Sequence, residues 1–284
     1  MISSARSVIP ALLSLVLAAT AGCGGPEGTV TADPEEAAAQ APAAAPARPA
    51  TLPLSASGRT AVFSHGPRDA ADKTVALTFD ADMTADQGAR AAGGERFDNP
   101  ALVALLRAEK VPATFFVTGM WARTYPAQAR SIGRDPLFEV GNHSYSHHAF
   151  TEPCYGLPAL GQGRALAEVR EGFAALRGAG IEDPLPYFRF PGGCYDDRAL
   201  RAVAPAEVTA VQWDVAGGDP FNRDADDIVR QVLGQVRPGS VVVLHCTLSA
   251  APATAEAVRR IVPELRERGY RFARVSELIA DSLR

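Results

Sequence analysis

The histidines of this chain are concentrated in one short stretch. Three of the five lie within GNHSYSHHAF, residues 141–150. His143 and His147 are four positions apart, so one helical turn or a compact loop would bring both imidazoles to one metal ion. Such a pair by itself is more typical of a surface or capping role, and a carboxylate from another element would favour metal binding. We interpret His148 as a loop neighbour of the two candidate ligands.

Two imidazoles and one carboxylate would leave coordination positions open, which is typical of a catalytic rather than a structural zinc site. The elements that must position such ligands are predicted by the hydrophobic pattern. Short apolar runs bounded by turn residues predict strands at 74–79, 113–119, 137–142, 187–190, 208–215, 240–245 and 270–275. Amphipathic stretches predict helices between them at 99–110, 163–180, 224–236 and 254–269. This alternation indicates an α/β fold in a single domain, either a parallel barrel or a doubly wound sheet.

The polar residues of the chain follow these predicted strands. FDAD ends the first strand, HSYSHH follows the third, RFPGGCYD ends the fourth, DVAGGDP ends the fifth and HC ends the sixth. In parallel α/β folds, functional residues gather just past the carboxyl ends of the strands. The sequence therefore predicts an active site where these five segments meet.

The composition excludes one class of partner. The chain has 284 residues, of which 47% are hydrophobic and 21% are charged, and its formal net charge is -4. These values are typical of a globular chain of one or two domains. No run of Lys or Arg follows a periodic face, so we do not expect the chain to bind nucleic acid.

The first 58 residues predict an export signal followed by a tether. Residues 1–22 resemble a bacterial lipoprotein signal peptide, with an apolar run too short to favour a membrane span and small residues before Cys23. Lipidation of Cys23 would hold the protein stably on a membrane surface; plain secretion and an uncleaved anchor are the alternatives. Residues 23–58 are rich in Ala and Pro and predict a disordered, semi-extended tether. We expect an exported protein whose domain, residues 59–284, faces the cell wall or the extracellular side.

Five motifs in order resemble carbohydrate esterase family 4, the polysaccharide deacetylases that share the NodB homology domain. They are TFDAD at 78–82, HSYSH at 143–147, RFPGG at 189–193, WDVAGGDP at 213–220 and VLH at 243–245. The resemblance covers about residues 74–280. It implies a distorted (β/α)7-type barrel and the metal-dependent removal of acetyl groups from a polysaccharide.

The resemblance also implies roles for individual residues. Asp80 would be the general base, and His143 and His147 would bind the metal ion. The common form of the first motif places the third ligand directly after the base, but position 81 is Ala. Some members take the second carboxylate of Phe-Asp-x-Asp instead, so Asp82 is the candidate ligand, with a turn-capping Asp as the alternative.

The remaining motifs imply the acid and its support. His245 would protonate the departing amine, and the backbone N–H of Gly192 would stabilise the oxyanion. Arg189 could pair with a site carboxylate and Asp219 could fix a catalytic imidazole, although either could instead form a structural salt bridge. We assign three residues to the substrate pocket, with packing as the alternative for the last: Val243, Leu244 and Tyr145.

The expected cofactor is a divalent metal ion, Zn2+ in the first place, with Co2+, Mn2+ or Ni2+ as alternatives. The expected substrate is an N-acetylglucosamine-type polysaccharide, either peptidoglycan or a chitin-like glycan, acted on by a monomer. One alternative is an O-deacetylase of a polymer such as xylan. Another is a carbohydrate-binding lipoprotein that has lost activity through Ala81 and the altered fourth motif.

Three cysteines remain besides Cys23, and each follows a motif: Cys154, Cys194 and Cys246. An exported chain permits disulfides, and three thiols allow one pair with one thiol left over. We favour a bond between Cys194 and Cys246, with Cys154–Cys194 or no bond as alternatives. We do not expect a cysteine nucleophile, because the metal-binding residues already account for hydrolysis.

Overall fold

The computed structural model describes residues 49–69 and 72–284. They belong to one compact unit, Ala47–Arg284. The predicted signal peptide, the lipidated Cys23 and most of the predicted tether lie outside the described residues. Within the described part of the chain, no helix is both long enough and apolar enough to cross a membrane.

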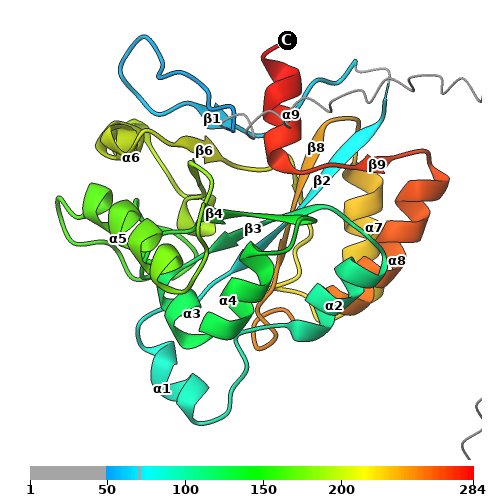
Figure 1. The fold of residues 1–284 in the computed structure, drawn as a ribbon, viewed down its shortest axis with the longest axis horizontal. Coiled ribbons are helices and arrows are strands. Elements are labelled where there is room, and N and C mark those ends of the chain that lie inside the picture. The colour runs from blue at the N-terminus through cyan, green and yellow to red at the C-terminus, as the bar shows by residue number, and fades with distance from the viewer. Residues whose placement is uncertain (1–48, 70–71) are drawn as a thin grey trace, which may run out of the picture. The chain divides into compact units, whose positions relative to one another are not determined.

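The core of the fold is one curled sheet of nine strands, in the order β1-β6-β5-β4-β3-β2-β8-β7, with β9 paired to β2 (Figure 1). The ladders between these strands are all parallel. The prediction of a distorted parallel α/β barrel is confirmed. The strands are β1 (Val62–Phe63), β2 (Thr74–Ala81), β3 (Ala113–Val117), β4 (Phe138–Asn142), β5 (Tyr187–Phe188), β6 (Thr209–Val211), β7 (Val215–Ala216), β8 (Ser240–His245) and β9 (Arg271–Phe272).

Central strands are buried on both faces, as expected for a parallel sheet covered by helices. All eight residues of β2 are buried. Alternate residues of β2 and β8, such as Phe79 and Leu244, join the large core cluster, whereas Ala76 and Val241 join a second cluster on the other face. Three helices contribute to the large cluster and lie on one side of the β2–β8 pair: α2 (Pro100–Ala108), α7 (Ala225–Gln235) and α8 (Thr254–Glu267) (Figure 1).

The four predicted helices are present as α2 (Pro100–Ala108), α5 (Ala165–Gly178), α7 (Ala225–Gln235) and α8 (Thr254–Glu267). Capping explains why α2 and α7 begin where they do: Asn99 accepts a hydrogen bond from Leu102 N, and Asp224 accepts one from Asp226 N. Five shorter helices were not predicted: α1 (Gln87–Ala92), α3 (Gly119–Thr124), α4 (Pro126–Gly133), α6 (Asp197–Val203) and α9 (Val275–Ser282).

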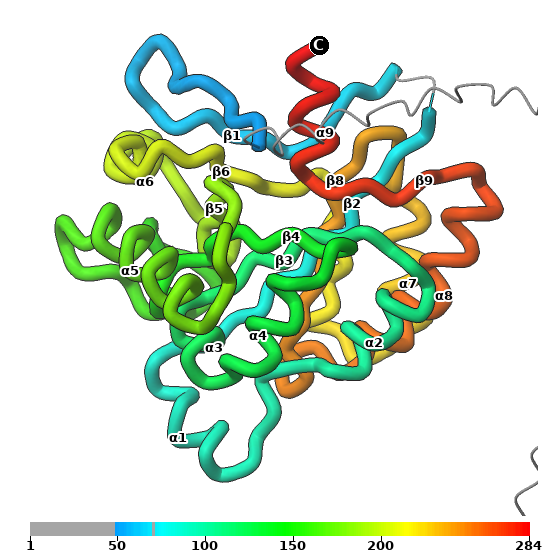
Figure 2. The backbone as a smooth tube through the Cα atoms, viewed as in Figure 1, coloured from blue at the N-terminus to red at the C-terminus, as the bar shows by residue number. Residues whose placement is uncertain are grey.

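The strand register brings chemistry-bearing residues together. Asp80 pairs with His245 on β8 and with Phe116 on β3. Strands β4, β3, β2 and β8 run side by side, so residues after their carboxyl ends meet at one end of the sheet (Figure 2). Parallel pairing therefore places the loops that carry the motifs around a common centre.

Two contacts extend the domain beyond its predicted start at residue 59. Tyr187 Oη donates to Ala50 O at 2.8 Å, and Leu52 N donates to Thr209 Oγ1 at 2.9 Å. Ala50 and Leu52 also pack against the second core cluster. Residues 50–52 thus belong to the folded unit rather than to the tether.

The disulfide differs from the one we favoured. Cys154 is bonded to Cys194, with a Cα–Cα distance of 5.9 Å, and Cys246 is a buried free thiol among the described cysteines. Cys246 is wholly buried in the large core cluster at the end of β8, whereas the other two lie on loops. The favoured Cys194–Cys246 pair is therefore wrong, and the alternative pairing is present.

Candidate active site

The candidate metal ligands come from the ends of two strands, β2 and β4, which lie on either side of β3. Asp82 follows β2, and His143 and His147 lie in the loop after β4. One donor atom from each residue lies within 4.8 Å of the others, and His147 Nε2 is 3.5 Å from Asp82 Oδ2. A compact loop, rather than a helical turn, brings the imidazoles together: Ser144 and His147 have φ angles of 73° and 59°.

The hydrogen bonds of His143 fix which of its nitrogens can bind a cation. Its Nδ1 lies 2.9 Å from the carbonyl oxygen of Arg189 and must carry the proton that this contact needs. The lone pair on Nε2 then lies 3.4 Å from Asp80 Oδ2. Two acceptors at that distance would be stabilised by a cation between or beside them, so the donor set fits a divalent metal ion.

The protonation state of His147 also suits the binding of a metal ion. Burial lowers its pKa to about 4, although the negative charge of Asp82 opposes this shift. The imidazole is therefore neutral at neutral pH. Metal ligation requires a neutral imidazole, so no proton has to be displaced from His147.

Two residues that the sequence analysis missed hold the ligands in place. Thr247 Oγ1 donates to Asp82 Oδ1 at 2.8 Å. The carboxylate of Glu168, on α5, is buried and accepts hydrogen bonds from the backbone N–H and the hydroxyl of Ser146, between the two histidines. Neither residue belongs to a recognisable motif. Only their contacts identify them.

Asp80 is paired with an arginine in the interior. Arg189 has no exposed surface, and its Nη1 donates to Asp80 Oδ1 at 2.7 Å and to Thr78 Oγ1 at 2.9 Å. Its guanidinium also stacks on the Phe116 ring, 4.0 Å from the centroid. Burial alone would raise the pKa of Asp80, but the charges of Arg189 and two neighbouring histidines hold it below its ordinary value. Asp80 is therefore an ionised carboxylate.

His245 is paired with a carboxylate. Asp219 is buried; its Oδ1 lies 3.0 Å from His245 Nδ1, and its Oδ2 accepts from His245 N at 2.8 Å. Thr254 Oγ1 donates to the same Oδ2 at 2.6 Å. Burial lowers the pKa of His245, but the charge and hydrogen bond of Asp219, together with the charges of Asp82 and Asp80, outweigh this effect and raise it to about 9.

The segment that carries Gly192 has a conformation that favours glycine. Gly192 and Gly193 have φ angles of 62° and 70°. A Cβ at Gly192 would lie 2.6 Å from Cys154 Sγ, and one at Gly193 would lie 2.5 Å from the Trp213 ring. The loop therefore packs too closely for larger residues. The oxyanion role of Gly192 stays a prediction.

Two of the residues predicted to line the substrate pocket face opposite sides of β8. Val243 is two residues before His245 on β8 and shares its face of the strand. Leu244 points to the opposite face, where it is wholly buried in the large core cluster, and a Cβ at Gly217 would lie 2.3 Å from its Cδ2. The assignment of Leu244 to the pocket is therefore wrong, because successive strand residues face opposite sides.

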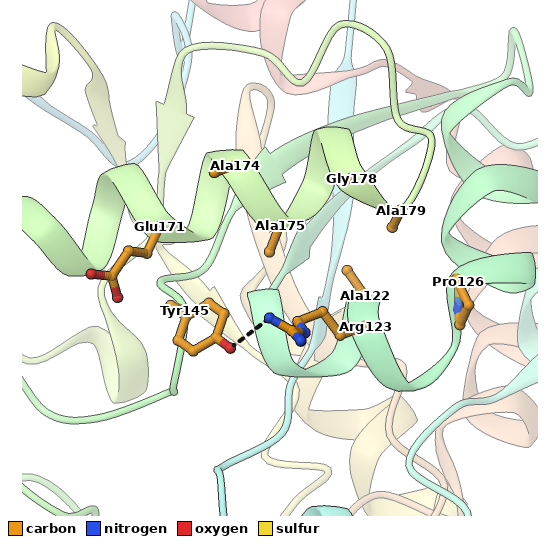
Figure 3. A pocket seen from close by; sticks show the side chains of 9 residues that line it. All are labelled: Ala122, Arg123, Pro126, Tyr145, Glu171, Ala174, Ala175, Gly178 and Ala179. Atoms are coloured by element: carbon orange, nitrogen blue, oxygen red, sulfur yellow. Dashed lines mark hydrogen bonds between the residues drawn. The ribbon is translucent and has the colours of Figure 1, made fainter.

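Tyr145 lies in a separate groove between α3 and α5. Arg123 Nη1 donates to its hydroxyl at 3.4 Å (Figure 3). A Cβ at Gly119 would lie 2.4 Å from the Tyr145 ring. The groove has a volume of about 660 Å³, and none of the candidate metal ligands or catalytic residues lines it. Tyr145 thus belongs to this groove and not to a pocket around the metal ligands. Its predicted assignment to the substrate pocket is corrected accordingly.

The described chain is similar to known deacetylases. Residues 68–211 match the family of polysaccharide deacetylases. A chitooligosaccharide deacetylase of Sinorhizobium fredii is 32% identical over 181 residues, which are 60% of this chain and 80% of the relative. A peptidoglycan-N-acetylglucosamine deacetylase of Bacillus cereus is 28% identical over 210 residues, which are 73% of this chain and 89% of the relative.

A solved structure supports the fold. A peptidoglycan N-acetylglucosamine deacetylase in complex with a substituted benzamide superposes with a TM-score of 0.64 at 24% identity, covering 77% of this chain and 92% of that one. The family match, the curled parallel sheet and the strand-end motifs all agree. This chain belongs to the polysaccharide deacetylases of carbohydrate esterase family 4.

Proposed function

We propose that this protein is a metal-dependent hydrolase that removes N-acetyl groups from N-acetylglucosamine-type residues of a cell-wall polysaccharide. The proposal is carried by one observation: three candidate metal ligands lie at one end of the sheet together with two buried ion pairs, Arg189–Asp80 and His245–Asp219. The relatives named for chitooligosaccharide and peptidoglycan deacetylation support an amide substrate. We propose Zn2+ as the ion, because two imidazoles and a carboxylate are typical of catalytic zinc.

The residues divide the reaction between them. A divalent ion held by Asp82, His143 and His147 would supply a Lewis acid for the acetyl carbonyl and the attacking water. Asp80, ionised and hydrogen-bonded to Arg189, would take the proton of that water.

The other side of the site would complete the hydrolysis. The backbone N–H of Gly192 would donate to the oxyanion, a contribution of about 3 kcal/mol when such a donor is fixed in place. His245, protonated through its pairing with Asp219, would donate a proton to the leaving amine. The C–N bond breaks, and acetate and the free amine leave.

We further propose that the protein is exported and tethered to a membrane through Cys23, which would let the domain reach a surrounding wall. This proposal is supported by the lipoprotein-like pattern of residues 1–22 and the Ala- and Pro-rich segment that follows. Radiolabelled fatty acid incorporation into the wild-type protein but not into Cys23→Ser would support the anchor. Equal labelling of both would overturn it.

The enzymatic proposal is tested by acetate release with metal analysis on peptidoglycan, chitin oligomers and acetylated xylan. We expect bound metal and acetate from the first two substrates in the wild type, and bound metal with little acetate in Asp80→Asn. Release from xylan alone would identify an O-deacetylase. Absence of both metal and acetate on all three would leave only a binding role.

A further inference from the structure

Two aromatic side chains are exposed at the rim of the sheet. Tyr155 is 75% exposed and Phe221 is 77% exposed, the highest values among the large hydrophobic side chains of the described residues. Their ring centroids are 5.8 Å apart, with an interplanar angle of 37°. Adjacent exposed aromatic rings leave apolar area in water, and contiguous exposed apolar surface often marks a binding site. We call these two residues the aromatic pair.

Each member of the pair is linked to a different part of the active site. A methyl group at Gly192 would lie 3.2 Å from Tyr155 Cδ2, so Tyr155 adjoins the predicted oxyanion donor. Phe221 is two residues after Asp219, which holds His245. Two residues span at most about 7 Å of chain, so Phe221 is close to that acid–base pair. The aromatic pair thus connects the loops that carry Gly192 and Asp219.

The loop that carries Tyr155 is held in an uncommon conformation. Tyr155 has a φ angle of 46°, in the left-handed region that bulky residues rarely adopt, and Gly156 follows with a φ of 75°. The disulfide Cys154–Cys194 joins this loop to the segment just after Gly192. Strain of this kind persists where surrounding structure fixes it, and it is common at ligand-binding sites.

The loop that carries Phe221 is also fixed. Phe221 N donates to Gly218 O at 3.1 Å, and Asp224 N donates to Asn222 Oδ1 at 2.9 Å. Neither bond involves the Phe221 ring, which stays exposed. Both loops therefore present their rings without the ordering cost that a mobile loop would incur on binding.

The geometry points to a sugar-binding platform: we propose that Tyr155 and Phe221 stack on the apolar face of a sugar ring next to the residue that loses its acetyl group. This inference rests on the proposed function and adds a subsite to it. Pyranose rings present C–H groups on one face, and aromatic side chains are the residues that best cover such surfaces at interfaces. The platform would act on substrates that have a neighbouring sugar and not on an acetyl ester without one, because only a neighbouring ring reaches it.

The test compares Tyr155→Ala and Phe221→Ala with the wild type on chitin oligomers from dimer to hexamer. We expect kcat/KM on the hexamer to fall about tenfold in each variant, mainly through KM, since one lost aromatic contact is of that order. The loss should be absent on an aryl acetate, which carries no sugar, and Phe221→Tyr should keep most of the activity on the hexamer. Leu54→Ala, which removes another exposed apolar side chain, is the control and should behave as the wild type.

Three outcomes would overturn the platform. One is unchanged activity on the oligomers in both variants, and another is an equal loss on the aryl acetate, which would indicate that the rings only support Gly192 or Asp219. The third is unchanged glycan binding together with a lower sedimentation coefficient in the variants, which would assign the pair to self-association.

Calorimetric binding of the hexamer, measured in the same variants, separates this proposal from the enzymatic one. Weaker binding in Tyr155→Ala and Phe221→Ala would support the platform even if the wild type released no acetate. Acetate release with unchanged binding in the variants would support the enzyme and refute the platform.

Discussion

Two buried ion pairs flank the candidate metal site, and they prepare opposite chemistry. In one, the fully buried Arg189 keeps the Asp80 carboxylate ionised, so Asp80 can accept a proton. In the other, Asp219 raises the pKa of His245 to about 9, so His245 carries a proton to donate. Burial opposes the charged form in both cases, and the partner is the largest of the neighbouring charges that together outweigh it. The sign of that largest charge distinguishes the side that favours a base from the side that favours an acid.

The largest effect is expected from removing either titrating group. Asp80→Asn and His245→Asn should each lower kcat on a chitin oligomer by roughly 10²–10⁴-fold, because each removes one proton transfer. An aryl acetate, whose leaving group needs no proton, distinguishes the two sides. His245→Asn should recover most of its activity on that substrate, whereas Asp80→Asn should not. Equal losses on both substrates would contradict the assignment of acid and base.

The next effect concerns stability. Arg189→Met leaves the Asp80 carboxylate buried without its partner, so the free energy of unfolding should fall by about 3–5 kcal/mol at neutral pH. The comparison is Arg68→Met, since Arg68 pairs with Asp214 but is 30% exposed and should cost less. Urea denaturation monitored by circular dichroism measures both. A smaller loss in Arg189→Met than in Arg68→Met would refute the importance of this pair.

The third effect is a change in pH dependence. His245 must be protonated to act as an acid, so activity should be lost as the pH rises through about 9. Asp219→Asn removes the charge that raises this pKa while burial still lowers it, so the alkaline limb should move to lower pH. The protonated fraction of His245 at pH 7 should then be smaller than in the wild type, and kcat at that pH should fall with it. A pH–rate profile with the same limb in both proteins would contradict the pairing.

The smallest effect concerns metal affinity. Thr247→Val deletes the hydroxyl that donates to Asp82 and keeps the side-chain shape, so the affinity for Zn2+ should fall about tenfold. Thr247→Ser retains a hydroxyl and should bind close to the wild type. Competition with a chromophoric chelator measures all three proteins. An unchanged affinity in Thr247→Val would indicate that Asp82 is not a ligand, or needs no help in orientation.

The sequence predicted the central strands well because their signal is local, whereas β1 was not predicted and the one strand expected at 208–215 is two, β6 and β7, towards opposite ends of the strand order. Apolar runs bounded by turn residues located β2, β3, β4 and β8, and the strand-end rule then brought Asp80 and His245 to one place, where they are register partners. The short helices were missed because six to eight residues carry too little periodicity to stand out. The wrong assignment of Leu244 could have been avoided from the sequence alone, since successive residues of a strand face opposite sides and Leu244 is next to His245.

The sequence by itself determined the fold class, the family and the residues that could do the chemistry, because each of these depends on local pattern and on motif order. Only the tertiary structure decided which cysteines are bonded, that Glu168 and Thr247 hold the candidate ligands, and that Tyr155 lies against Phe221. These contacts join segments far apart in the chain. No local spacing encodes them, because they depend on how loops from different strands meet after the sheet has curled.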